Sequence, residues 1–220
     1  MLGKLVVEPN ASRACAHFLA QRMIRAGRAV HVAFSGGKSP NRMFEHLSGL
    51  PVPWEQVTIW QVDERVAPAG DDARNWTHLW SRLAVPAKLS PIPVDAVGDP
   101  QGALAAGRYA ETLASPATRG VLDLVHLGLG DDGHTASLFP GDSVLRKREP
   151  DVAAVGPYLG HARVTLTLPA IARARALVFL VTGASKRAML KRLLAGDTKI
   201  PAGMLRHPDF TVFADPEAAG

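Results

Sequence analysis

Cysteine, aromatic residues and long apolar runs are scarce in this chain of 220 residues, and each scarcity excludes a class of protein. The single cysteine, Cys15, has no second thiol for an internal disulfide, which is typical of a reducing compartment, and we expect it to be buried on the first helix. No stretch approaches the ~18 uninterrupted apolar residues of a membrane span. The first residues run into a strand pattern without the charged and apolar regions of a signal peptide. We therefore expect a cytoplasmic protein without a membrane partner.

Positive charge is in modest excess, with 25 Lys and Arg residues against 20 Asp and Glu residues. The basic residues are dispersed, and the only three-residue run is Arg146-Lys147-Arg148. Surfaces that bind nucleic acid combine clustered basic residues with aromatic side chains, and aromatic residues make up only 6% of this chain. We expect no nucleic-acid partner, and we interpret the excess charge as an attraction for small anions.

The arrangement of apolar segments predicts an α/β fold. At 47% hydrophobic content and without a Ser/Gly/Pro-rich linker, residues 1–220 are expected to form one domain. Strands and helices alternate, which is typical of a mostly parallel sheet with helices on both faces. Strands are expected at residues 4–7, 29–34, 57–62, 122–127, 164–168, 176–181 and 210–213. Helices are expected at residues 10–26, 41–47, 76–83, 103–113 and 185–194, the first with Asn10 or Ser12 as N-cap and Gly27 as its end, and residues 214–220 are expected to fray.

A glycine-rich turn that carries acids and a histidine follows the apolar strand 122–127. Its residues are Gly128, Gly130, Asp131, Asp132, Gly133 and His134. Ligands of open α/β sheets collect outside the carboxyl ends of the strands, so these side chains are expected to face a substrate crevice. The glycines allow close approach of the backbone to a ligand. The alternative is an ordinary tight turn with a solvated acidic pair.

The glycine spacing of this turn also matches the dinucleotide-binding fingerprint. That fingerprint needs a helix that begins at the third glycine and an acidic residue about 20 positions later. Here Pro140 and Gly141 interrupt the chain seven residues after Gly133, and a charged cluster follows. Nucleotide binding is therefore disfavoured.

A second glycine-rich turn, residues 34–40, lies between a strand and a helix. Backbone N–H groups of such a turn, together with the helix dipole, favour an anion, so Ser35, Gly36 and Gly37 are candidate phosphate ligands, with the amide of Lys38 beside them. The turn lacks the first glycine of a Walker A loop, since Val32 occupies that position, which disfavours ATP and GTP. The alternative is a simple turn with Ser39 as the N-cap of the helix.

Two further loops carry charged side chains at strand ends. Arg65 offers a planar fork for a phosphate or carboxylate, and Asp63 can accept hydrogen bonds from sugar hydroxyl groups. A surface salt-bridge loop is the alternative there, and Asn75 is expected to cap the helix that starts at Trp76. Lys186 follows the strand 176–181 in the first turn of a helix, where a cation opposes the helix dipole unless an anion lies nearby. It is therefore a phosphate candidate, or alternatively a surface lysine.

Five motifs resemble the glucosamine-6-phosphate isomerase/6-phosphogluconolactonase family, and most closely its lactonases. They are Ser35-Gly-Gly-Lys-Ser-Pro40, Asp63-Glu-Arg65 with Asp72 to Asn75, the stretch from Leu127 to Gly141 with Asp-Gly-His-Thr-Ala-Ser-Leu-Phe-Pro, Arg163-Val-Thr-Leu-Thr167, and Gly183-Ala-Ser-Lys186. The resemblance implies a Rossmann-like domain without metal or cofactor. It also implies hydrolysis of 6-phospho-D-glucono-1,5-lactone, a phosphorylated sugar lactone, in the oxidative pentose phosphate pathway. We expect a monomer.

Within this resemblance, His134 is expected to act as the general base that activates water, because an imidazole is suited to proton transfer near neutral pH. Asp132 is expected to orient the imidazole. Phosphate is expected to contact the Ser35–Gly37 turn, Arg65 and Lys186, with Arg163 as a weaker candidate. Serine catalysis is disfavoured because a Gly-x-Ser-x-Gly elbow is lacking and Ser137 is expected to begin a helix.

Two other functions stay open. The deaminase relatives resemble this chain around His134 but carry an acidic residue five positions later, where this chain has Phe139. That difference disfavours glucosamine-6-phosphate isomerisation. A non-catalytic sugar-phosphate sensor is the other alternative, since related folds can serve as ligand-binding domains.

Overall fold

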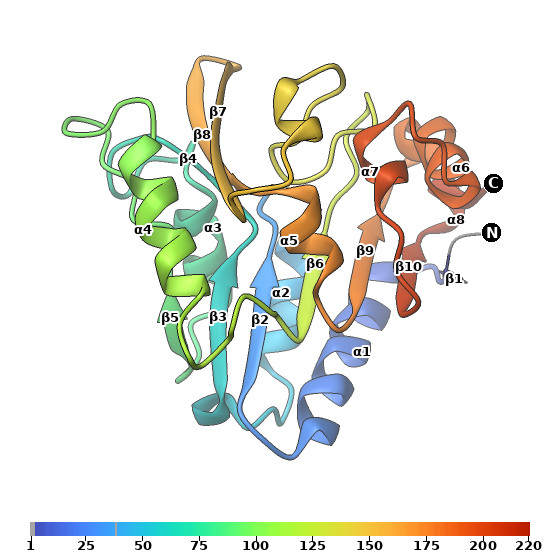
Figure 1. Ribbon diagram of the computed structural model, residues 1–220. Coiled ribbons are helices and arrows are strands. Elements are labelled where there is room, and N and C mark those ends of the chain that lie inside the picture. Colours follow the sequence, from blue (N-terminus) through green and yellow to red (C-terminus); the bar gives the residue numbers. More distant parts are fainter. Residues whose placement is uncertain (1–2, 38) are drawn as a thin grey trace.

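The computed structural model describes residues 3–37 and 39–220, and its centre is a parallel sheet of seven strands (Figure 1). All neighbouring strands in this sheet pair in parallel. The chain order changes direction between β2 and β6, which creates the switch point at which open α/β sheets bind ligands. In spatial order the strands are β1 (Lys4–Val7), β10 (Phe210–Ala214), β9 (Leu177–Val181), β6 (Leu124–Leu127), β2 (Val30–Phe34), β3 (Val57–Gln61) and β5 (Lys88–Ser90).

Helices cover both faces of the sheet and close two separate hydrophobic cores, as the alternation of apolar segments predicts. Successive residues of a strand point to opposite faces, so in β9 Leu177, Phe179 and Val181 pack in one core and Val178 and Leu180 in the other. One core includes α1 (Ala11–Ala26), α2 (Asn41–Ser48) and α3 (Asn75–Arg82). The other includes α4 (Ala103–Leu113), α5 (Leu168–Ala172), α6 (Arg187–Ala195), α7 (Pro201–Met204) and α8 (Pro216–Ala219).

A second, antiparallel sheet lies beyond the carboxyl end of the parallel one, at the top of Figure 1. It consists of β4 (Asp63–Arg65), β8 (His161–Leu166) and β7 (Val152–Tyr158). The strand predicted at residues 164–168 is therefore wrong in two respects. It ends before Leu168, which already begins α5, and it pairs antiparallel with β4 and β7 instead of joining the parallel sheet. An apolar run does not reveal which kind of sheet buries it. β4, β5 and β7 were not predicted.

The predicted helix caps can be compared with the observed ends of α1, α2 and α3. Asn10 accepts a hydrogen bond from the Arg13 amide, and Gly27 adopts the left-handed conformation at the end of α1, so both predictions are confirmed. The predicted cap at Asn75 is wrong, and so is the cap at Ser39 in the alternative interpretation of the glycine-rich turn. Pro40 and Arg74 are the N-cap residues, and neither caps with its side chain.

Three smaller predictions have mixed outcomes. Ser137 does not begin a helix, since residues 131–142 form turns. The expectation that residues 214–220 fray is wrong, because Asp215 caps α8 by accepting a hydrogen bond from the Ala218 amide. Cys15 is fully buried on α1, as expected, and burial raises the pKa of its thiol.

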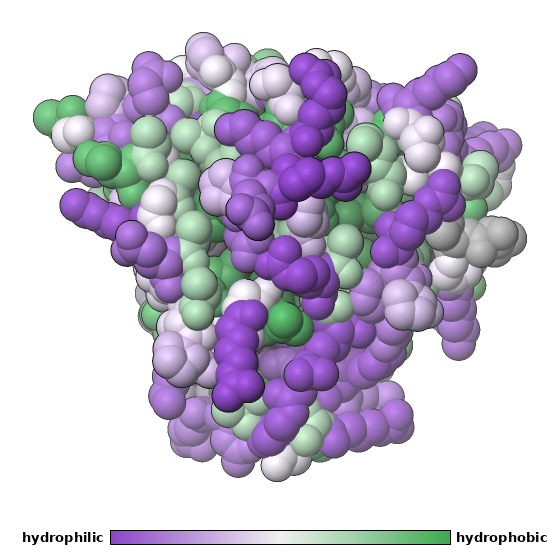
Figure 2. Space-filling model, viewed as in Figure 1, coloured by the Kyte–Doolittle hydropathy of each residue, from purple (hydrophilic) through white to green (hydrophobic). Residues whose placement is uncertain are grey.

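Three short 3-10 helices complete the elements: η1 (Trp54–Gln56), η2 (Ser143–Arg146) and η3 (Ala184–Lys186). On the face shown in Figure 2, hydrophilic side chains run down the middle and apolar side chains lie mostly in small groups between them. None of the helices within residues 3–37 and 39–220 has the length and apolar character that crossing a lipid bilayer requires.

Asp123 joins the amino-terminal ends of the strands, opposite the carboxyl edge. Its carboxylate accepts hydrogen bonds from the Arg28 side chain and the His31 amide, and it lies 3.1 Å from Nε of Arg175. Burial raises the pKa of Asp123, but these contacts outweigh burial and lower it overall. A carboxyl group whose pKa is lower in the folded state stabilises the fold above its unfolded pKa, and this stability is lost as the pH falls through the folded pKa.

We therefore expect Asp123→Asn to lower the free energy of unfolding at pH 7 by about 1–2 kcal/mol, the size of a charged hydrogen bond. Urea unfolding at several pH values measures this difference, which should shrink as the pH falls below about 4, the ordinary range of Asp. The matched control is Glu111→Gln, on the exposed face of α4. A deficit that is the same at pH 7 and at low pH would contradict the ionic origin of the effect.

Candidate active site

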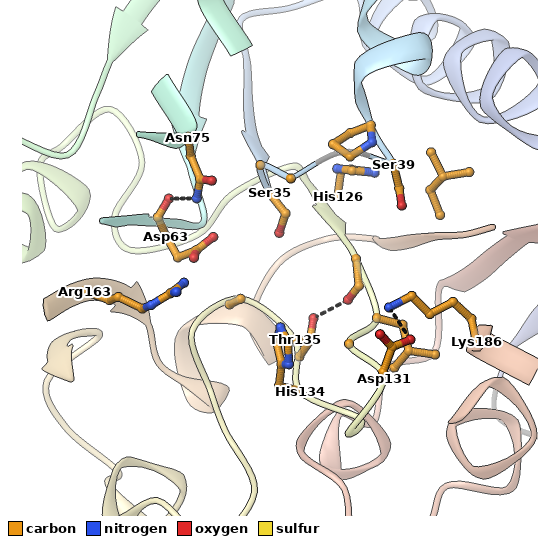
Figure 3. Close-up of a pocket in the computed structure, with 18 of the residues that line it drawn as sticks. Ser35, Ser39, Asp63, Asn75, His126, Asp131, His134, Thr135, Arg163 and Lys186 are labelled. Carbon is orange, nitrogen blue, oxygen red and sulfur yellow. Dashed lines mark hydrogen bonds and ion pairs between the residues drawn. The ribbon is translucent and has the colours of Figure 1, made fainter. Parts of the chain in front are cut away.

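A cleft of about 430 Å³ opens at the carboxyl ends of four neighbouring strands, β3, β2, β6 and β9, beside the antiparallel sheet (Figure 3). Of the nine predicted site residues, eight line it: Ser35, Gly36, Gly37, Asp63, Arg65, His134, Arg163 and Lys186. The ninth, Asp132, lies next to His134. The loops that the sequence predicts to meet at one edge of the sheet do meet there.

The imidazole of His134 is held by the turn that follows β6. Its Nδ1 lies 2.6 Å from Oδ1 of Asp132, and the same oxygen accepts a hydrogen bond from the His134 amide at 3.0 Å. Gly130 leaves the room that the ring needs, because a Cβ there would lie 2.1 Å from Nδ1. Among the described residues, Nε2 has no hydrogen-bond partner, and His134 lines the cleft.

Asp132 determines which nitrogen of His134 carries the proton. Partial burial raises the pKa of Asp132, but the hydrogen bonds from the His134 amide and ring outweigh it and lower the pKa overall. The ionised carboxylate can only accept, so Nδ1 must donate. The neutral ring then carries its lone pair on Nε2, which is the form that a general base requires.

Lys186 and Asp131 form an ion pair on the right of Figure 3. Nζ of Lys186 lies 2.8 Å from Oδ1 of Asp131, and Ser185 donates a hydrogen bond to the same oxygen at 3.0 Å. The Lys186 contact and then the Ser185 contact lower the pKa of Asp131. The lysine lies in η3 rather than inside a longer helix, and Asp131 supplies a negative charge beside it. A bound phosphate would therefore share Lys186 with this carboxylate.

Two arginines on neighbouring strands of the antiparallel sheet also line the cleft. Arg65 on β4 and Arg163 on β8 are partners in the antiparallel register. Burial and then the charge of Arg65 lower the pKa of the Arg163 guanidinium, while Asp63 and Glu64 oppose the shift. Like charges directly opposite each other destabilise a sheet. An anion that bridges the two guanidinium groups would remove this cost.

Buried polar atoms without a partner gather at this cleft. Within the part of the chain that the structure describes, eight buried side-chain nitrogen and oxygen atoms lack a hydrogen-bond partner. Six of them belong to residues that line the cleft: Oγ of Ser35, Nε of Arg65, Oδ1 of Asn75, Nε of Arg163 and both ring nitrogens of His126. Buried polar groups are rarely left unpaired, so this concentration favours a polar ligand.

Several site residues were not predicted from the sequence. Asn75 donates through Nδ2 to the carbonyl oxygen of Asp63, and its side chain lies where a Cβ on Gly36 would be. Ser137, which is fully buried, donates to Oδ2 of Asp63 at 2.6 Å. The charged cluster at residues 71–75 and the motif around Ser137 can both be recognised in the sequence. Neither pattern predicts a contact with Asp63, because Asp63 meets these residues only in the folded chain.

His126 lies in the predicted strand 122–127, and the sequence indicated no site role for it. It lies inside β6 and is buried, and burial lowers its pKa to about 3. The ring is therefore neutral at physiological pH, and it packs against Phe34 and Phe44 in one of the cores. Its carbonyl oxygen accepts a hydrogen bond from the Ser35 amide, which fixes the start of the glycine-rich turn.

The turn after β2 brings Ser35, Gly36 and Gly37 to the cleft. Gly37 has a φ of 103°, which side chains rarely tolerate. The prediction that Lys38 contributes its amide lies outside the described residues. Phosphate binding by this turn stays a prediction. No group of three or more His, Cys, Asp or Glu side chains within residues 3–37 and 39–220 could hold a metal ion.

Comparisons with known proteins agree on the family. The family profile described as "Glucosamine-6-phosphate isomerases/6-phosphogluconolactonase" matches residues 8–213. A 6-phosphogluconolactonase of Synechocystis is 38% identical over 177 residues, which are 74% of this chain and 71% of that protein. The chain spans only 22% of the length of two other relatives, the GDH/6PGL endoplasmic bifunctional proteins of rabbit and human.

Solved structures give the same fold. A 6-phosphogluconolactonase from Shewanella baltica is 26% identical with a TM-score of 0.82, over 98% of this chain and 97% of that one. A monomeric glucosamine-6-phosphate deaminase reaches the same TM-score at 21% identity, over 100% of this chain and 99% of that one. The fold alone therefore does not separate the two reactions. On the match of the profile to nearly the whole chain, this protein belongs to the glucosamine-6-phosphate isomerase/6-phosphogluconolactonase family.

Proposed function

We propose that this protein hydrolyses 6-phospho-D-glucono-1,5-lactone to 6-phospho-D-gluconate, the second step of the oxidative pentose phosphate pathway, with His134 as the general base. The observation that carries the proposal is the His134–Asp132 pair, in which Nε2 of His134 has no hydrogen-bond partner among the described residues. His134 lines a cleft together with Arg65, Arg163 and Lys186. Relatives named 6-phosphogluconolactonase, at 34% and 38% identity over about three quarters of the chain, support the same reaction.

The proposed reaction starts from the neutral imidazole of His134, in which Nδ1 carries the proton and Nε2 carries the lone pair. Nε2 of His134 takes a proton from water as the water oxygen forms a bond to the lactone carbonyl carbon. The carbonyl oxygen becomes an oxyanion. Backbone amides of one of the two glycine-rich turns, or an arginine, would stabilise this charge. The bond from that carbon to the ring oxygen then breaks, and the proton on His134 passes to the leaving oxygen. The histidine returns to its starting form.

The candidate contacts of the substrate phosphate are Lys186, Arg65, Arg163 and the amides of the Ser35–Gly37 turn. Lys186 and Arg163 lie on opposite sides of the cleft, with His134 between them in Figure 3. The partnerless nitrogens of both arginines support an anionic ligand on their side. The ion pair with Asp131 holds Lys186 at the other side without a ligand.

For Lys186→Ala we expect KM for the phosphorylated lactone to rise about tenfold with a smaller change in kcat, because one charged contact with phosphate is lost in ground and transition state alike. Initial rates over a range of lactone concentrations measure both constants. Lys191→Ala, exposed on α6, is the matched control. Equal rates of the unmodified protein on phosphorylated and unphosphorylated gluconolactone would remove the phosphate site from the proposal.

The direct test of the function is lactone hydrolysis coupled to detection of 6-phosphogluconate, with the enzyme-free rate subtracted. Ammonia release from glucosamine 6-phosphate tests the deaminase alternative in parallel. Phe139 disfavours that alternative, since a phenyl ring that packs against His134 supplies no carboxylate for sugar ring opening. Saturable binding of the lactone without turnover would instead favour the sensor.

A further inference from the structure

Phe139 lies between two other rings at the edge of the site. Its ring centroid is 4.5 Å from that of His134, with 31° between the ring planes. It is 4.0 Å from the ring of Tyr158, with 27° between the planes. Tyr158 is on β7, and its hydroxyl group donates a hydrogen bond to Asp142. The imidazole therefore packs on an aromatic stack that is anchored in the antiparallel sheet.

Tyr158, the other member of the aromatic stack beside Phe139, is uncharged. Burial, and then the hydrogen bond and charge of Asp142, raise the pKa of Tyr158 to about 12, so the phenol keeps its proton at physiological pH. The face of an aromatic ring carries partial negative charge and attracts a cation. In the reaction proposed above, His134 is neutral before the step and positively charged after it takes the proton.

We propose that Phe139 is a positioning residue that holds the imidazole of His134 and stabilises its charged form through its ring face. The inference rests on the proposed function, because the charge appears on His134 only when it acts as a base. The contact is then stronger in the transition state than in the ground state, and such contacts raise kcat. Asp132 stabilises the same charge through Nδ1, so Phe139 acts in addition to a carboxylate.

A second cation touches the same ring. The Cζ atom of Arg163 lies 5.6 Å from the centroid of Phe139, and its Nη2 donates to the carbonyl oxygen of Tyr158 at 3.3 Å. If the ring served only to hold Arg163, its loss would weaken binding of the phosphorylated substrate. The two roles therefore separate in the kinetics, since the His134 role changes kcat and the Arg163 role changes KM.

Site-specific fluorinated phenylalanines at position 139 test this inference, because added fluorine weakens the charge of the ring face with little change of shape. We expect kcat to fall stepwise with the number of fluorines, by about fivefold for the pentafluoro ring, with KM changed less than twofold. Phe139→Leu should lose about tenfold in kcat, and Phe139→Trp should recover most of it. The matched control is the same fluorinated residue at Phe18, which lies on α1 and contacts Phe213 and Arg22.

Each outcome decides a different point. A graded fall in kcat at nearly constant KM supports the inference. A kcat that is insensitive to fluorine while Phe139→Leu is impaired shows a role in shape alone, and a rise in KM alone shows a role through Arg163; either result overturns the inference and leaves the proposed function intact. No lactone turnover by the unmodified protein would overturn the proposed function and this inference with it.

Discussion

Replacing His134 by alanine is expected to lower kcat for the phosphorylated lactone at least about 100-fold, the low end of general acid–base contributions, while KM stays nearly unchanged. The substitution removes the only atom assigned to take the proton from water, and it leaves Lys186, Arg65 and Arg163 in the cleft. Because the lactone also hydrolyses without enzyme, the spontaneous rate must be measured at each concentration and subtracted.

Two further variants test whether the loss of activity comes from the loss of the basic nitrogen of His134. In His134→Asn the shorter side chain can still donate to Asp132 but offers no basic nitrogen, so it should be as inactive as the alanine variant. His17→Ala removes an exposed histidine from α1 and should keep full activity. Turnover of either His134 variant near that of the unmodified protein would remove His134 from the mechanism.

Replacing Glu64 by alanine is expected to lower the free energy of unfolding by about 3–5 kcal/mol, the range for removing one member of a buried charged network. Glu64 has 0% exposure, and its carboxylate is the acceptor that the start of α3 needs, although it lies on β4. It accepts hydrogen bonds from the amides of Arg65, Asn75 and Trp76 and from Nε2 of Gln61, at 2.7–2.9 Å. Without it these buried donors lose their partner.

Urea unfolding followed by circular dichroism measures this loss. Glu64→Gln keeps the shape of the side chain but not its charge, so its free energy of unfolding should fall less, by about 1–2 kcal/mol. This variant provides the measurement if the alanine variant does not fold. Glu111→Ala on the surface of α4 is the control and should change stability by less than about 0.5 kcal/mol. A loss below about 1 kcal/mol for Glu64→Ala would show that water or neighbouring groups replace the carboxylate.

The parallel sheet could be predicted because its signals are local. Apolar strands such as 122–127 and 176–181 alternate with amphipathic helices, and this order places helices on both faces. The same order puts the loops after the strands at one edge. Ser35, Asp63, His134 and Lys186, which are far apart in the sequence, could therefore be assigned to one cleft before any contact was known.

The antiparallel sheet could not be predicted because its pairing is decided by distant segments. β4 is only three residues long and charged, and it becomes a strand because β8, nearly 100 residues later, supplies the hydrogen-bond partners. The same applies to Glu64, whose role depends on the position of α3. Burial by tertiary contacts overrides the local preference of charged residues for a loop.

Gly130 has a consequence for sequences beyond this one. Its backbone does not need the freedom of glycine, since its φ is not in the left-handed region, and the imidazole of His134 and the carboxylate of Asp132 exclude a side chain there. A family member that has lost both the histidine and the aspartate is under no such constraint and can accept alanine at this position. If His134 is the general base that we propose, glycine at 130 together with aspartate at 132 and histidine at 134 should mark the family members that share this mechanism.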